Sequence, residues 1–231
     1  MSNNSLTDLA LSVWNTLFGG PLVWDALWET LIMVGVSGFA AIVLGIPLGI
    51  LLNVSDKGGL LEGLAANRVL GFFINVFRSI PFIILCVAMF PLTAMIMGTS
   101  IGVKGAILPL TVAAVPFMAR LAETSFKEVP SGLIEAAQGM GATPSQIVFK
   151  VLLPEAMPGI ISGVTIMLVS LIGYSAMAGM VGAGGLGTLA INYGYYRYRT
   201  DVMIAVMIVI VVVVQLVQWF GDWLAARVNH R

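Results

Sequence analysis

The chain has 231 residues, of which 59% are hydrophobic and only 10% are charged, and its mean hydropathy is +1.01. An ordinary soluble domain carries about 25% charged residues, so this composition excludes a water-soluble globular domain and indicates a protein that lies in lipid. Lys plus Arg equals Asp plus Glu at 11 each, and this balance gives no net field that would attract nucleic acid.

Residues 1–20 predict an amphipathic helix at the outer membrane surface. One helical face gathers apolar residues, namely Leu6, Ala10, Val13, Trp14 and Leu17. A signal peptide would begin with basic residues, and this segment has none. We therefore expect an interfacial helix.

Five later stretches of the sequence contain no charged residue. They are residues 31–52, 80–97, 105–119, 160–181 and 202–220. At 1.5 Å per residue, about 20 residues cross the roughly 30 Å of bilayer hydrocarbon. We predict five transmembrane helices in a domain of residues 21–228, at about 26–53, 70–97, 104–121, 157–182 and 201–226. The short third span requires Lys104 and Arg120 to extend their charged ends outward.

Positive charges are distributed unevenly between the two sides of the membrane. Leaving Arg78 aside, one side holds seven, Lys57, Arg68, Arg120, Lys127, Lys150, Arg227 and Arg231, and the other holds three, Lys104, Arg197 and Arg199. Because cytoplasmic segments carry the excess of Lys and Arg, we expect the N-terminus outside and the C-terminus in the cytoplasm. A second span that begins near Val69 would put Arg78 about 13 Å along it. We favour a snorkelling or intersubunit role for Arg78 over substrate contact.

The stretch VGAGGLGT, residues 181–188, contains the G-x-G-x-x-G spacing of dinucleotide-binding proteins. That fingerprint requires a strand before it and a helix after it, whereas here it follows a predicted membrane helix. We therefore expect no nucleotide to bind. The glycines are predicted to form a turn or a close helix contact; they are Gly182, Gly184, Gly185 and Gly187.

The cytoplasmic segment 130–154 predicts a helical hairpin. Pro130 and Ser131 start a first helix, which ends at the glycines of GMG. Thr143 caps a second helix with Pro144 at its first position. Two further prolines, Pro154 and Pro158, are expected to stop it before the next span. A hairpin held outside the membrane is either a docking surface or a structural connector.

A resemblance favours the docking surface. Glu135, Ala136, Ala137 and Gly141, followed by VLLP with Leu153 and Pro154, resemble the signature E-A-A-x3-G-x9-I-x-L-P of permeases of ATP-binding-cassette (ABC) importers, with Val151 in place of the usual Ile. Further blocks are similar to the permeases of methionine importers in that class. They are NVFRSIPFIIL (75–85), MGTSIG (97–102), PLTVAAVPFMAR (109–120), GLIEAAQGMGATPSQIVFKVLLPEAMPG (132–159) and GYSAMAGMVGAGGLG (173–187).

The resemblance implies an all-α integral membrane protein with five spans and a coupling-helix hairpin, the transmembrane domain of a type I ABC importer. It also implies a homodimer in the bacterial inner membrane, two ATPase subunits that hold ATP and Mg on the cytoplasmic face, and a methionine-binding lipoprotein outside. Methionine, in its L and D forms, would then cross by alternating access. The residues that would couple to the ATPase are Glu135, Ala136, Ala137, Gly141, Leu153 and Pro154.

Other functions fit the residues less well. A secondary transporter or channel usually places a carboxylate within a span, and we interpret the boundary carboxylates Asp25, Glu29, Glu123 and Asp201 as solvated helix ends. A membrane enzyme needs a nucleophile, base or metal set. With one cysteine, Cys86, and one histidine, His230, none can be assembled, and we expect no cofactor or metal on this chain. Another amino acid, glycine betaine or a phosphonate is the alternative solute.

Polar and small residues of the fourth span are candidates for the translocation pathway: Ser170, Tyr174, Ser175 and Met177. Ser170, Tyr174 and Met177 are spaced i, i+4 and i+7, so they share one helical face. Hydrogen bonding to a neighbouring helix is the alternative role for this face.

Overall fold

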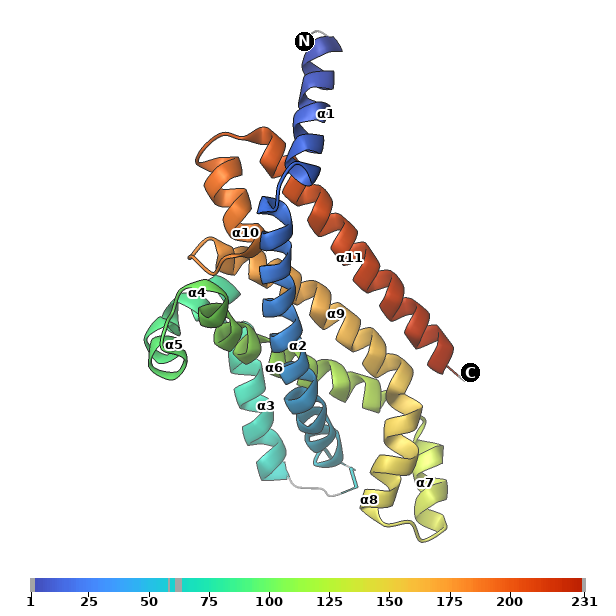
Figure 1. The fold of residues 1–231 in the computed structure, drawn as a ribbon. Coiled ribbons are helices and arrows are strands. Elements are labelled where there is room, and N and C mark those ends of the chain that lie inside the picture. The colour runs from blue at the N-terminus through green and yellow to red at the C-terminus, as the bar shows by residue number, and fades with distance from the viewer. Residues whose placement is uncertain (1–2, 58, 61–63, 230–231) are drawn as a thin grey trace. The chain divides into compact units, whose positions relative to one another are not determined.

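The computed structural model describes residues 3–57, 59–60 and 64–229, and this part of the chain is entirely helical between its turns (Figure 1). The elements are α1 (Asn3–Phe18), α2 (Leu22–Val54), α3 (Leu64–Ser79), α4 (Phe82–Ala88), α5 (Phe90–Met97), α6 (Gly102–Lys127), α7 (Ser131–Gly139), α8 (Pro144–Ile147), the π-helical turn η1 (Val148–Leu152), α9 (Leu153–Gly179), α10 (Gly185–Leu189), the π-helical turn η2 (Ala190–Tyr195) and α11 (Thr200–Val228).

Four helical segments of the described chain are long and apolar enough to cross a membrane, and a bent helix pair makes a fifth span if it counts as one. The four are Leu22–Val54, Gly102–Lys127, Pro144–Gly179 and Thr200–Val228, and the bent pair is Asn67–Ser79 with Phe82–Ala88. The predicted all-α membrane fold is thus confirmed, and the five predicted spans correspond to these four helices and the bent pair.

The second predicted span, at about 70–97, is not one continuous helix. The chain leaves the helix at Ile80, and Pro81 caps the start of α4 with an extended backbone, φ −56° and ψ 133°. Proline has no N–H to donate to a preceding turn and disfavours helical dihedrals in the residue before it. A second break lies at Met89, between α4 and α5, and Gly98, with φ of +77°, ends α5.

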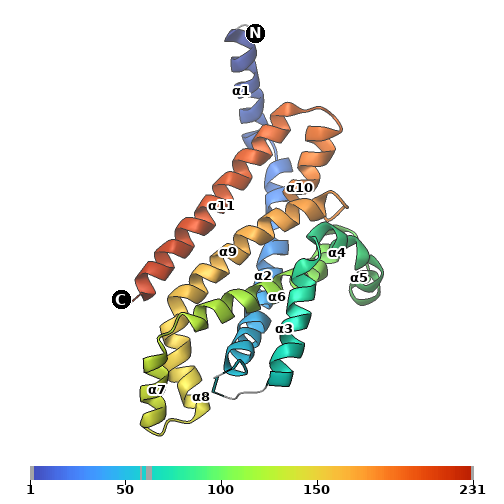
Figure 2. The ribbon, with the colours of Figure 1, turned by 180° about the vertical axis from the view of Figure 1, so that it is seen from behind.

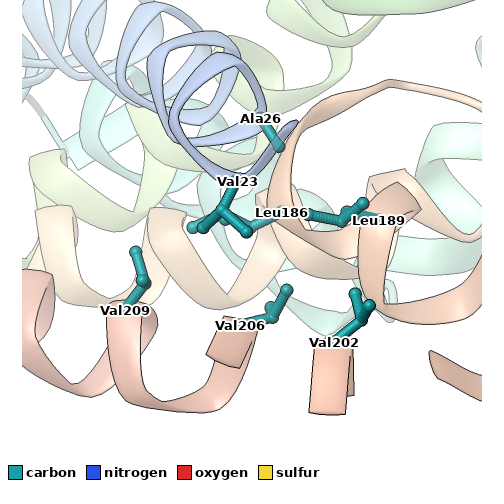
Figure 3. Packing of buried hydrophobic residues seen from close by; sticks show 7 residues of the cluster. All are labelled: Val23, Ala26, Leu186, Leu189, Val202, Val206 and Val209. Atoms are coloured by element: carbon teal, nitrogen blue, oxygen red, sulfur yellow. The ribbon is translucent and has the colours of Figure 1, made fainter. Parts of the chain in front are cut away.

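The chain divides into two compact units, and the first comprises the described residues of Met1–Ser37, Pro81–Leu110 and Val169–Leu216. Its core is built by aliphatic side chains of α2, α10 and α11 that point toward one another (Figure 3): Val23, Ala26, Leu186, Leu189, Val202, Val206 and Val209. Leu17 of α1 packs against this cluster, and the Thr16 hydroxyl donates to Asp201 Oδ2 at 2.8 Å. The C-terminal half of α1 therefore packs against the first unit.

Within α1 the predicted apolar face is divided. Val13 is buried, whereas Trp14 is 61% exposed and its ring contacts Phe18 with centroids 4.4 Å apart. Residues 1–2 and the side chain of Leu6 lie outside the described part of the chain. One side of α1 thus packs on protein, and the other presents aromatic rings outward.

The second unit comprises Gly38–Ile80, Thr111–Leu168 and the described residues of Val217–Arg231. Leu52 of α2, Ile74 of α3 and Ala119 of α6 form a buried cluster there. Helices α2 and α6 approach closely, because a Cβ on Gly45 would lie 2.7 Å from the Cβ of Met118. Small residues allow such close backbone packing between membrane helices.

Candidate coupling site and translocation helix

Helices α7 and α8 form a hairpin in the second unit and lie side by side in both views of the ribbon (Figures 1 and 2). Helix α7 ends in a Schellman turn, in which Ala142 N–H donates to Ala137 O at 3.1 Å and Gly141 N–H donates to Gln138 O at 2.9 Å. Gly141 takes the left-handed conformation that this turn requires, with φ +78°.

The predicted cap of the second hairpin helix is confirmed. Gln146 N–H donates to Thr143 Oγ1 at 3.4 Å, and Thr143 N–H donates to Gln146 Oε1 at 2.9 Å, which completes a capping box. The two caps fix both sides of the turn. The hairpin is therefore specified by local signals that the sequence carries in full.

The expected stop at Pro154 and Pro158 is wrong. The chain runs as a continuous helix from Pro144 to Gly179 through the π-helical turn η1, and both prolines lie inside it. The N–H of Leu153 reaches back to Val148 O, a five-residue step. In a regular α-helix a proline ring clashes with the carbonyl group four residues before it. In a π-helical turn the carbonyl groups are displaced, so a proline that follows the turn is tolerated with less steric conflict.

The EAA residues occupy different environments within α7. Glu135 and Ala136 are exposed, whereas Ala137 is 3% exposed and packs inward. Two large apolar side chains of the hairpin are also exposed, Met140 at 81% and Phe149 at 65%. Leu153 is half-buried and Pro154 exposed. Exposed apolar side chains on a short, capped hairpin that also exposes a carboxylate have the character of a protein-binding surface.

A charge cluster lies immediately before the hairpin, at the end of α6. Glu123 is 4% exposed, and its carboxylate contacts Arg120 Nη1 at 2.5 Å and Lys127 Nζ at 2.9 Å. Lys127 Nζ also lies 2.8 Å from Asp56 Oδ2, and Arg120 Nη2 donates to Asn75 Oδ1 at 2.8 Å. The Lys127 ammonium, together with the backbone N–H of the residue after Asp56, lowers the pKa of the Asp56 carboxyl.

This cluster corrects two expectations. Glu123 is not a solvated helix end, because α6 continues to Lys127 and buries it. Arg120 does not extend outward from the end of a short span, since it lies inside α6 and is held by Glu123 and Asn75. Lys104, near the other end of α6, is exposed as expected.

The glycine stretch forms a tight turn into α10 in the first unit. Gly182, Gly184 and Gly185 have φ of +91°, +86° and +72°, and a Cβ on Gly187 would overlap the carbonyl oxygen of Ala176. Gly182, Gly184 and Gly185 thus form a turn, and Gly187 lies in close contact with Ala176. The backbone N–H groups of the turn point at protein rather than at open space, as the next contacts show.

Helix α2 supplies the acceptors for that turn. Gly185 N–H donates to Glu29 Oε2 at 2.6 Å, and Leu186 N–H donates to Thr30 Oγ1 at 2.9 Å. We expected Glu29 to be a solvated helix end; it is exposed, but it lies inside α2 and also accepts a hydrogen bond from the start of α10. Asp201 also has partners, with Arg199 Nη2 2.6 Å from its Oδ2. Asp25 lies exposed in the first turn of α2.

The pathway candidates lie on α9 in the first unit. Tyr174 is half-buried and stacks on Phe82 of α4, with ring centroids 4.8 Å apart and planes 9° from parallel. Ser170 is half-buried and Met177 is 45% exposed. Ser175 is 2% exposed and its hydroxyl donates to Ile172 O at 2.8 Å, so it points away from the face of the other three.

Arg78 lies in the last turn of α3, in the second unit, and is exposed. Its guanidinium carbon is 5.8 Å from the centroid of the Phe117 ring, which is a cation–π contact. The positive charge also lies at the C-terminal end of its helix, where the helix dipole favours a cation. These contacts give Arg78 a structural partner on α6.

Comparison with known proteins identifies the family. The sequence pattern of the family described as the inner-membrane component of binding-protein-dependent transport systems matches residues 45–230. The chain belongs to this family. It is therefore a multi-pass inner-membrane permease component and not itself an enzyme.

Two curated members of this family are closely similar to this chain in sequence. The probable D-methionine transport system permease protein MetI of Vibrio cholerae is 54% identical over 91% of this chain and 93% of its own length. The D-methionine transport system permease protein MetI of Escherichia coli K12 is 53% identical over 69% of this chain and 75% of its own. These matches confirm the resemblance seen in the sequence.

Solved structures agree with the fold. An inward-facing form of the MetNI methionine ABC transporter superposes with a TM-score of 0.89 at 51% identity, over 90% of this chain and 97% of that one. An amino acid ABC transporter solved with histidines has a TM-score of 0.75 at 19% identity, over 90% of this chain and 94% of that one. The second likeness extends the fold alone to a broader class of importers.

Sequence reasoning missed the ion cluster and the capping by α2. Arg120, Glu123 and Lys127 are spaced i, i+3 and i+7, which is a helical pattern in the sequence, but the predicted span ended at residue 121, before Glu123 and Lys127. Glu29 and Thr30 left no local signal, since each lies 156 residues from its partner.

Proposed function

We propose that this chain is the permease subunit of an ATP-driven importer of methionine. The observation that carries the proposal is the 54% identity to a methionine transport permease along nearly the full length of both chains. The hairpin supports it, since it presents Glu135 and Ala136 outward on a surface of the kind that an ATPase subunit would bind.

In the proposed assembly two copies of the chain form a homodimer that encloses the pathway. Two ATPase subunits, which hold ATP and Mg, bind the two hairpins on the cytoplasmic face, and a methionine-binding lipoprotein delivers the solute from outside. ATP binding closes the ATPase pair and moves the hairpins, and the helices then alternate between inward-facing and outward-facing arrangements. The coupling contacts are made by Glu135, Ala136 and Gly141, with Leu153 and Pro154 at the base of the second hairpin helix.

The solute pathway in this proposal follows the α9 face of Ser170, Tyr174 and Met177. The stacked ring of Tyr174 and the thioether of Met177 offer an apolar, polarizable surface that suits a thioether side chain. Ser175 supports the helix instead, because its hydroxyl is buried and bonded to its own backbone.

The proposed orientation places the hairpin in the cytoplasm and the N-terminus outside. With Cys86 replaced, a single cysteine at Ser131 and one at Thr99 are expected to react with a membrane-impermeant thiol reagent from opposite sides. Ser131 is exposed at the start of α7 and Thr99 half-buried after α5, so each is accessible to the reagent from its own side. Labelling of both cysteines from outside in intact cells contradicts the orientation.

Uptake by the complete complex tests the function. The permease, its ATPase and its binding lipoprotein are reconstituted in liposomes, and labelled L- and D-methionine are offered outside with ATP enclosed. ATP-dependent accumulation of methionine, outcompeted by unlabelled methionine but not by glycine betaine, is the expected result. Accumulation of glycine betaine or a phosphonate in its place would assign the chain to another solute of the same class.

A further inference from the structure

A buried carboxylate outside the coupling signature connects the hairpin to the membrane helices. Among the residues that the structure describes, Glu123 is the one charged residue whose surface is almost wholly buried, at 4% exposure. Burying a carboxylate is costly unless it is paired and hydrogen-bonded. Its two oxygens are each used, one by Arg120 at 2.5 Å and the other by Lys127 at 2.9 Å.

The two cations extend the cluster to other elements of the second unit. Arg120 donates to Asn75 on α3 at 2.8 Å, and Lys127 binds Asp56, just beyond the end of α2, at 2.8 Å. Glu123 is therefore the shared centre of contacts from α6 to α3 and to the segment after α2. Without it, the two cations would face each other with no buried anion between them.

The cluster lies at the base of the hairpin. Lys127 ends α6 and α7 begins at Ser131, so three residues separate them. Asp56 and Lys127 also line, with Ser131, Glu135 and Gln138 among others, a cavity of about 290 Å³. The ion pair and the exposed EAA carboxylate thus belong to the same local structure.

We propose that Glu123 is a positioning residue for coupling, which ties the base of the hairpin to α3 and to the end of α2 so that these segments move together. This inference rests on the proposed importer function. A displacement of the hairpin by the ATPase then reaches α2 and α3 through the cluster. Without Glu123, Lys127 loses the buried anion that holds its ammonium in place beside Asp56, so the segment after α2 follows the hairpin less closely.

The alternative is that Glu123 contributes to stability alone, and three variants separate the two roles. Glu123→Gln keeps the shape and removes the charge. Glu128→Gln is the matched control, because Glu128 is exposed and lies one residue beyond the end of α6. The triple variant R120M/E123L/K127M replaces the buried charges by apolar side chains, an exchange that commonly preserves stability, but it cannot contact Asn75 or Asp56 through ions.

The readout is the number of ATP molecules hydrolysed per methionine imported, measured in proteoliposomes of the full complex beside the melting temperature. We expect this ratio to rise at least about fivefold in E123Q, the lower end for an energetic coupling between sites. It should rise similarly in the triple variant even where its melting temperature equals that of the wild type. Faster hydrogen exchange in residues 53–57 accompanies the rise in both variants, and E128Q behaves as the wild type.

A wild-type ratio in the triple variant at wild-type melting temperature overturns the proposal, because stability would then be the whole role of the cluster. A wild-type ratio in a folded E123Q complex also overturns it. Failure of the wild-type complex to import methionine at all is a different result, since it contradicts the proposed function. In that case, hydrogen exchange at residues 53–57 still tests whether Glu123 links the hairpin to the end of α2. Unchanged exchange in E123Q overturns the proposed role of Glu123.

Discussion

Replacing Gly141 or Gly139 by alanine adds one methyl group near the hairpin turn, and the two substitutions should have opposite effects on the stability of that turn. Gly141 has φ +78°, and a Cβ placed there meets nothing within 4 Å, so the cost of Gly141→Ala comes from the backbone alone. A left-handed conformation costs an L-residue about 1 to 2 kcal/mol, which corresponds to a factor of roughly 5 to 30 in the population of the closed turn. Gly139 also has open space around it but is helical, so Gly139→Ala should stabilise α7 by about 0.5 to 1 kcal/mol.

Hydrogen exchange of the Ala142 amide measures this effect locally. That amide donates to Ala137 O at 3.1 Å and closes the Schellman turn. Its protection is expected to fall by roughly 5- to 30-fold in Gly141→Ala and to stay level or rise in Gly139→Ala. ATPase retained on the purified permease should fall in parallel in the first variant only. Equal protection in both variants would refute the reasoning, because backbone strain at position 141 would then not hold the turn.

Three further outcomes follow from single contacts. Lys127 lowers the pKa of Asp56 from its ordinary value of 3.8, so this pair stabilises the fold above that pH, and the stabilisation is lost as the pH falls through the lowered pKa. Asp56→Asn should therefore remove this acid-side dependence of the melting temperature. The effect is about a few tenths of a kcal/mol, because the pair is exposed. Gly187→Ala should lower the yield and melting temperature of the protein, because the added Cβ overlaps the backbone of Ala176. Gly35→Ala, whose Cβ would meet nothing within 4 Å, should leave both unchanged. Equal losses in the two variants would contradict the close contact at Gly187. Thr143→Ala should cost the second hairpin helix about 1 kcal/mol, seen as faster exchange of its first-turn amides, while Thr143→Ser keeps the cap.

The hairpin could be predicted from the sequence because its determinants are local. Pro130 starts α7, Gly141 closes it, and Thr143 with Gln146 caps the next helix, and each acts within a few residues of its position. Membrane spans are likewise predictable, because hydropathy acts over one continuous segment. The fold class and the helical hairpin could therefore be predicted from the sequence.

Prolines and charges were harder to interpret because their effect depends on their surroundings. Pro81 breaks a helix that hydropathy alone extended, whereas Pro154 lies in a continuous one. Glu123 was predicted to be solvated, but α6 continues past it and supplies two cations that bind its carboxylate. The capping of α10 by Glu29 joins residues 156 positions apart, and no pattern in a single sequence encodes that pairing.

The π-helical turn η1 gives a geometric meaning to the spacing of the signature. Nine residues separate Gly141 from Val151, and they comprise the cap, the short helix α8 and part of the widened turn. One residue corresponds to about 100° of rotation about a helix axis. An extra residue in a regular helix would turn α8 by that angle, whereas the wider turn η1 takes up the extra residue and Ile147 stays buried. The count of nine therefore spans a turn that holds one residue more than an α-helical turn, and Ile147 keeps its place on the buried side of the hairpin.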